Sequence, residues 1–129
     1  MTEWRKRDRR KPSGGAQAHA SDEELFSTEL GKILGRLRGV IDSDRSAFYD
    51  GSETYDHASL AVMRLAAMLE DSSPFTNRFA ALDDEARRGI ITTRNIISHV
   101  GYASMDDEIF WRTVTVDVPA ALGSLGLLR

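Results

Sequence analysis

The amino-acid sequence predicts an all-α protein, an antiparallel bundle of four to five helices. Apolar residues recur at alternating spacings of three and four along most of the chain, which places them on one face of a helix. Alternation with period two is typical of a strand, and it is confined to the stretch from Thr113 to Val118, where a strand is the alternative. Gly, Pro, Asp and Ser gather in brief stretches between the apolar segments, as expected for the short connections of such a bundle.

Length and composition are typical of one domain with a substantial core. The chain has 129 residues, of which 41% are hydrophobic and 29% charged, ordinary values for a soluble globular protein. It has no cysteine, which excludes disulfides, thiolate zinc sites and cysteine nucleophiles and fits a reducing compartment. No apolar run approaches the roughly 18 residues that cross a bilayer, and no apolar region of a secretory signal follows the charged N-terminus. We therefore expect a cytoplasmic protein without membrane contact.

The charge is divided unevenly along the chain. Residues 1–20 carry six basic and two acidic side chains, a net charge of +4, and the remaining 11 basic and 18 acidic side chains give −7. The first segment lacks the apolar residues for a core, so we expect a disordered basic arm over 1–20 and a helical domain over 21–129. The arm is either an electrostatic tether for RNA, with Trp4 available for base stacking, or a solvated tail. The acidic body is unlike a broad nucleic-acid platform, whose affinity depends on phosphate contacts.

The first helix is expected to begin at Ser21, which with Glu24 forms a capping box, and to end near Asp42. Its buried face is the apolar set Phe26, Leu30, Ile33, Leu37 and Val40. Gly31, Gly35 and Gly39 form a smooth stripe on the same helix, either for close approach of another helix or simply tolerated. The charged Lys32, Arg36 and Arg38 between them exclude a membrane dimer motif.

Two further helices follow. Asp50-Gly51-Ser52 predicts a break, after which a helix is expected over about 54–70 and ends at Ser72-Ser73-Pro74. Its inner face is Ala58, Ala61, Val62, Leu65, Met68 and Leu69. Asp83 or Asp84 can cap a third helix over about 85–99, with the buried stripe Ala86, Ile90, Thr93, Ile97 and Val100.

A fourth helix is expected from about Ser104, and a short last one from Val118-Pro119 to Leu122. The packing face of the fourth is Ile109, Phe110, Trp111 and Val114. Its acidic start, Asp106-Asp107-Glu108, suits the first turn, where the helix dipole favours anions. A metal site is the alternative there, but three successive residues point in different directions, and His19 and His57 have no ligand spacing to a partner. We therefore expect no metal and no cofactor.

The candidate chemistry lies at the end of the third helix, in Arg94-Asn95-Ile96-Ile97-Ser98-His99. A fixed cation with a titratable imidazole, and no metal-ligand set, suits cleavage of a phosphodiester without a metal. Asn95 and His99 are four positions apart and share a helix face, whereas Arg94 and His99 are about 140° apart on an ideal helix. They can meet one phosphate if the helix ends between or just after them, as Gly101 suggests, or if two copies pool their residues.

The segment from about Arg88 to Leu122 resembles the C-terminal half of the HepT-like family within the HEPN superfamily. That family carries Arg, a polar residue, three more positions and then His, closely followed by Tyr, and here the motif is Arg94 to His99 followed by Tyr102. The sequel from Tyr102 to Trp111 and the later Asp117-Val118-Pro119 also resemble the family, whereas the first two helices match in pattern only.

The resemblance implies a HEPN-type helical bundle that forms a homodimer and acts as a metal-independent ribonuclease toxin. His99 would be the acid/base group, Arg94 would hold the scissile phosphate and Asn95 would orient it, with the 2′-OH of the RNA as nucleophile. The implied partner is a minimal nucleotidyltransferase antitoxin that transfers AMP to the tyrosine beside the histidine, here Tyr102. The family spacing is H-x-Y, whereas this chain has one more residue, His99-Val100-Gly101-Tyr102.

Two alternatives stand beside this interpretation. A catalytically silent helical interaction module, antitoxin-like or a scaffold, would form the same complex with a nucleotidyltransferase without cutting RNA. A plain four-helix adaptor would be a monomer with Arg94 and His99 apart and buried. Only the ribonuclease predicts that His99→Ala abolishes cleavage and leaves the fold intact.

Overall fold

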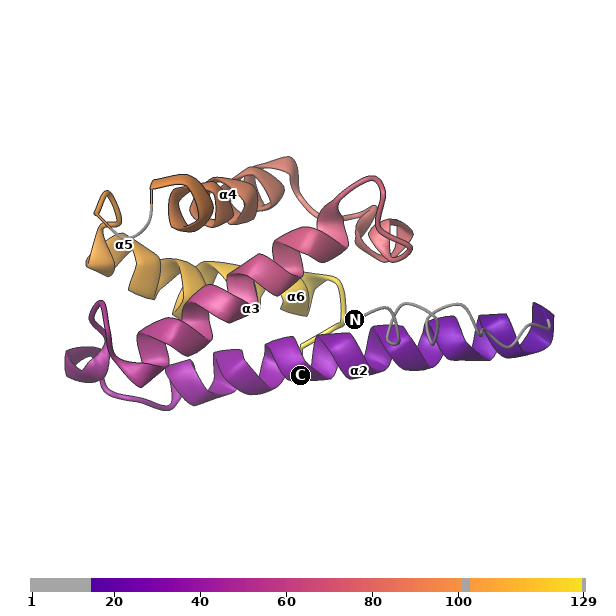
Figure 1. The fold of residues 1–129 in the computed structure, drawn as a ribbon, viewed down its shortest axis with the longest axis horizontal. Coiled ribbons are helices and arrows are strands. Elements are labelled where there is room, and N and C mark those ends of the chain that lie inside the picture. Colours follow the sequence, from indigo (N-terminus) through magenta and orange to yellow (C-terminus); the bar gives the residue numbers. More distant parts are fainter. Residues whose placement is uncertain (1–14, 101–102, 129) are drawn as a thin grey trace, which may run out of the picture.

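The computed structural model describes residues 15–100 and 103–128, and all regular secondary structure in these ranges is helical. The long helix α2 (Gly15–Ile41) runs along one side of the molecule, and α3 (Glu53–Leu69) folds back over it (Figure 1). Helix α4 (Asp84–Asn95) packs on the other side of α3, and α5 (Asp107–Arg112) and α6 (Val118–Ser124) complete the bundle. The predicted all-α class is thus confirmed for the described residues, none of whose helices is long and apolar enough to span a membrane.

The pairing of α2 with α3 follows the predicted apolar pattern. All five residues expected on the inner face of α2 are buried, and so are all six expected on α3. The break between the helices lies where it was predicted: Gly51 has a φ of 101°, and the Ser52 side chain caps α3 by accepting a hydrogen bond from the Tyr55 backbone N–H. A positive φ costs little at glycine, which has no Cβ, so the turn depends on this residue.

The predicted start of the first helix is wrong. Helix α2 begins at Gly15, upstream of Ser21, so Ser21 lies within the helix and the basic segment gives way to helix earlier than expected. Three alanines and a glutamine between Gly15 and Ser21 favour helix, which is the physical reason for the extension. The remainder of the predicted basic arm, residues 1–14, lies outside the described part of the chain.

The glycine stripe of α2 is not a contact between helices of this chain. Gly31, Gly35 and Gly39 are exposed, and a Cβ added at any of them would meet no atom within 4 Å. Of the two interpretations, the close helix crossing is therefore not formed within the described chain. Each glycine lies in a helix interior without a packing reason, where alanine would be more stable.

Aromatic residues close the bundle at both ends. At one end Phe48 contacts Tyr55, Phe110 and Trp111, with ring centroids 4.8, 5.3 and 5.2 Å away. At the other end Phe26 of α2 contacts two rings around the 3-10 turn Thr76–Phe79, at 5.5 Å to Phe75 and 6.1 Å to Phe79. The second group packs the middle of α2 against the connection that leads into α4.

The C-terminal third departs from regular α-helix twice. The chain continues from α4 into the π-helical segment Ile96–Val100, called η3, and from α5 into a second one, Thr113–Asp117, called η4. The strand alternative for Thr113 to Val118 is therefore wrong. Threonine hydroxyls donate to carbonyls four residues back at both places, from Thr93 to Gly89 and from Thr113 to Ile109, a bond that competes with the helix ladder.

The other predictions for this third are mostly confirmed. Asp83 is the N-cap residue of α4, although its side chain makes no capping hydrogen bond, and Ile90 and Thr93 are buried. Helix α5 begins later than Ser104, and Asp106 caps it by accepting from the Ile109 N–H. Ile109 itself is 64% exposed, so its assignment to the packing face is wrong. Phe110, the next residue, is buried in its place.

Candidate functional site

The three residues predicted to carry chemistry lie at the exposed end of α4. Arg94 and Asn95 are its last two residues, and His99 follows in η3. Arg94 is partly buried, whereas Asn95 and His99 are exposed. The end of one helical element therefore positions a cation, a carboxamide and an imidazole toward solvent.

The change from α to π geometry falls between Asn95 and His99. The Ile96 N–H donates to the carbonyls of both Thr92 and Thr93, and η3 then continues to Val100. A π-helix pairs residues five apart, so its wider turn rotates His99 back toward the face of Arg94, compared with a continuous α-helix. The predicted helix stop between the two residues is thus replaced by a widened turn. Gly101 and Tyr102 lie outside the described residues.

Arg94 is held by two neighbours. Its Nη1 donates to Glu70 Oε2 at 3.1 Å, and its Nε donates to Asn95 Oδ1 at 2.9 Å. The side chains of Arg94 and Glu70 are 24% and 48% exposed, so the ion pair is at the surface and open to competition from another anion. A guanidinium has five N–H donors, which leaves donors on Arg94 for a bound phosphate.

His99 has no such partner among the described residues. No hydrogen bond or ion pair joins its imidazole to another side chain among residues 15–100 and 103–128. The structure therefore brings Arg94 and Asn95 together by a hydrogen bond and leaves His99 one widened turn away. An exposed imidazole next to a cation and an amide can exchange a proton with a ligand that the other two hold.

Glu70 is a site residue that sequence reasoning missed. It is the C-cap of α3 and lies 24 positions before Arg94, so no local pattern connects the two. Its only sequence signal is an acidic residue at the end of a helix, where the dipole disfavours a negative charge. The packing of α3 against α4 brings the carboxylate to Arg94.

The remaining candidates do not form a metal centre. No group of three or more His, Asp or Glu side chains with metal-binding geometry occurs in the described ranges. Of the acidic run at α5, Asp106 caps the helix, Asp107 accepts from the Tyr55 hydroxyl at 2.8 Å and Glu108 pairs with Arg45. His57 is near Glu53, one turn away on the same helix, at 3.7 Å.

A concave feature lies along the first half of α4, away from these residues. A cleft of about 540 Å³ separates the first half of α4 from η4 and α6, and its lining on α4 extends to Ile90, about 7.5 Å along the helix from Asn95. The sequence analysis considered Asp83 only as a cap of α4 and did not predict the cleft.

Comparison of the chain with protein-family models, with curated proteins and with solved structures finds no match.

Proposed function

We propose that this protein is a HepT-like member of the HEPN superfamily, a metal-independent ribonuclease that acts through Arg94, Asn95 and His99. The observation that carries the proposal is their placement together at one solvent-facing helix end, with a backbone that widens between the cation and the imidazole. Arg94 is already oriented by Asn95, as a phosphate-binding guanidinium must be to act without reorganising.

The proposed reaction uses the substrate's own nucleophile. Arg94 donates to a non-bridging oxygen of the scissile phosphate, and Asn95 orients Arg94 and the phosphate. The 2′-OH of the RNA attacks phosphorus and loses its proton, while the 5′ oxygen leaves and gains one. His99 carries out one of these proton transfers, for which an imidazole is suited near neutral pH.

A second copy of the chain supplies the rest of the active site in this proposal. One chain offers one described imidazole at the site, whereas in-line displacement has both a proton to remove and a proton to supply. Ile109 and Val116, on the helix that follows His99, are 64% and 54% exposed and offer apolar surface for a dimer contact. A minimal nucleotidyltransferase would control the dimer, with Tyr102 as the candidate for AMP transfer.

One observation favours the catalytically silent interaction module instead. Arg94 is paired with Glu70 in the single chain, and no hydrogen bond joins it to His99. If this pair persists in the dimer, the guanidinium is neutralised and the surface serves for binding the nucleotidyltransferase alone. Cleavage separates the two candidates.

The test is cleavage of purified tRNA and mRNA in EDTA by the wild-type chain and by His99→Ala. His57→Ala is the matched control, because His57 is also an exposed helical histidine and lies on α3, away from the site. We expect cleavage by wild type and His57→Ala and a loss of about 100-fold or more in His99→Ala. Cleavage that survives in His99→Ala excludes this site. Absence of cleavage from a folded wild-type dimer supports the silent module.

A further inference from the structure

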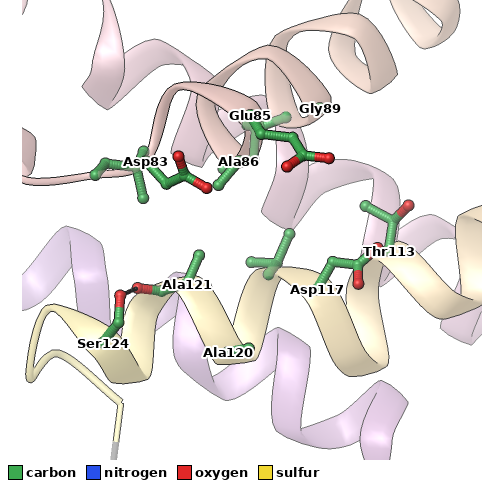
Figure 2. Close-up of a pocket in the computed structure, with 12 residues that line it drawn as sticks. Asp83, Glu85, Ala86, Gly89, Thr113, Asp117, Ala120, Ala121 and Ser124 are labelled. Carbon is green, nitrogen blue, oxygen red and sulfur yellow. Dashed lines mark hydrogen bonds between the residues drawn. The ribbon is translucent and has the colours of Figure 1, made fainter.

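The cleft at the beginning of α4 combines apolar walls with unpaired negative charge. Ala86 and Ile90 of α4 face Val118 and Ala121 of α6 across the cleft. Asp83 and Glu85 from one side and Asp117 from the other direct their carboxylates toward the space between (Figure 2). The described residues that line the cleft are Leu82, Asp83, Glu85, Ala86, Gly89, Ile90, Thr113, Asp117, Val118, Ala120, Ala121 and Ser124, and none of these is basic.

The three carboxylates are free to accept a cation. None of them has a hydrogen bond or ion pair to another side chain within the described ranges. Other charged side chains of the bundle do form such pairs between separate elements, for example Arg64 with Glu29. Like charges across a cleft repel one another, and an occupant with positive charge relieves that repulsion. An occupant that also has an apolar side chain can use the walls.

The chain itself contains a segment with this chemistry. Residues 4–11 read Trp-Arg-Lys-Arg-Asp-Arg-Arg-Lys, six cations and one acid beside an aromatic ring. We propose that the cleft is the docking site of this N-terminal basic segment in the same molecule. Its cations pair with Asp83, Glu85 and Asp117, and Trp4 packs on the apolar walls.

The geometry of the described chain permits this contact. An ion pair between Glu23 and Arg78 fixes α2 to the turn that precedes α4. From Gly15 to Glu23 is about 12 Å along the helix, and from Arg78 to Asp83 is at most about 18 Å of chain. Trp4 is 11 residues before Gly15, so residues 4–14 span at most about 36 Å when extended, about 6 Å more than the sum of these two steps. The beginning of α2 projects past the rest of the bundle (Figure 1), so the segment starts clear of other elements.

Covalent tethering makes even a weak contact effective. A segment joined by a short linker acts at an effective concentration on the order of 1 mM, so a contact with a Kd in that range is half occupied. Because the attraction is mainly between exposed charges, it weakens as salt shortens the Debye length from about 10 Å at 0.1 M to about 3 Å at 1 M.

The test measures the distance between the segment and the cleft in the full chain. The protein has no cysteine, so Thr2→Cys with Ala81→Cys accepts two spin labels at defined places. Ala81 is exposed and adjoins the cleft residue Leu82 without lining the cleft. Pulsed electron spin resonance at low salt should give a short-distance population, and at 1 M salt that population should fall severalfold.

Two triple variants test whether the short distance depends on the carboxylates of the cleft. Asp83→Asn, Glu85→Gln and Asp117→Asn together remove three charges from the cleft and should abolish the short-distance population. Asp42→Asn, Asp50→Asn and Asp56→Asn, all exposed and away from the cleft, make the same change in net charge and should preserve it. Circular dichroism verifies that both triple variants remain helical.

Three outcomes would overturn the proposal. One is the absence of a short-distance population in the wild-type background, and another is an equal loss in both triple variants. The third is disappearance of the short distance when the labelled chain is diluted with excess unlabelled chain, which would mean docking onto a second copy. Persistence under dilution supports docking within one molecule.

Discussion

Glu70→Gln should tighten the binding of RNA at the proposed site, because it removes the carboxylate that competes with a phosphate for Arg94. The Nη1–Oε2 distance is 3.1 Å and the two side chains are 24% and 48% exposed. A surface pair of this kind contributes about 0.2–1 kcal/mol. If a phosphate displaces Glu70, removal of the pair lowers the Kd by up to about fivefold, since about 1.4 kcal/mol is tenfold.

The assay is fluorescence anisotropy with a short labelled RNA whose 2′-OH groups are methylated, so that the nucleophile is blocked and binding alone is measured. Glu108→Gln is the matched control. It also breaks a surface ion pair, with Arg45 at 3.0 Å, and removes the same charge from a place away from Arg94. At about 0.1 M salt we expect a Kd two- to fivefold lower for Glu70→Gln than for Glu108→Gln.

Stability and salt dependence of the same two variants test whether the change in Kd comes from the loss of the Glu70 charge. Loss of either exposed pair should cost less than about 1 kcal/mol of unfolding free energy, so the fold is retained. The gain in affinity should shrink at high salt, where exposed charges are screened. Equal Kd values for the two variants, or weaker binding by Glu70→Gln, would refute the competition between Glu70 and the phosphate.

Three predictions concern the fold itself, each measured as a change in the free energy of unfolding by denaturant titration. Phe48→Ala should destabilise by about 3–5 kcal/mol, because the side chain is 1% exposed among three aromatic rings, and a loss under 1 kcal/mol would contradict this packing. Gly35→Ala should stabilise the fold by about 0.5–1 kcal/mol, because a Cβ there meets no other atom. Gly51→Ala should destabilise it by a similar or larger amount, because a φ of 101° is strained for alanine. A loss of stability in Gly35→Ala would instead indicate a close contact at the glycine stripe. Asp106→Ala should cost about 1 kcal/mol through loss of the cap of α5, and no change would show that the hydrogen bond to Ile109 contributes nothing.

Helix positions and buried faces were largely predictable from the sequence. Every residue that the apolar spacing assigned to the inner faces of α2 and α3 is buried, because a regular helix repeats its orientation and one face of each helix must be buried. The spacing did not identify Tyr55, Ser59 and Ala66, which are also buried in α3. The same reasoning failed at Ile109, which lies in the first turn of the six-residue helix α5, too short for its apolar spacing to define the buried face. The brief alternation of period two from Thr113 to Val118 left a strand as the alternative there, whereas Thr113–Asp117 is π-helical.

The candidate site was predictable in composition and not in arrangement. Arg94, Asn95 and His99 could be selected from the sequence because their residue types and spacing suit phosphate chemistry. Their relative orientation depends on the π-helical turn that begins at Ile96, and the spacing of residues in the sequence does not predict a π-turn. The hydrogen bond from Arg94 to Asn95 joins neighbours in the sequence, yet its direction depends on a rotamer that Glu70 helps to hold.

By itself, the sequence determined that the described chain is helical, which faces of its long helices are buried, and that an acidic domain follows a basic segment. These properties depend on local periodicity and on charge, which the order of residues contains directly. Only the tertiary structure decided that Glu70 meets Arg94 and that Asp117 faces Asp83 and Glu85 across a cleft. Both are contacts between residues distant in the chain, and they form because packing of the buried faces brings exposed side chains of different helices together.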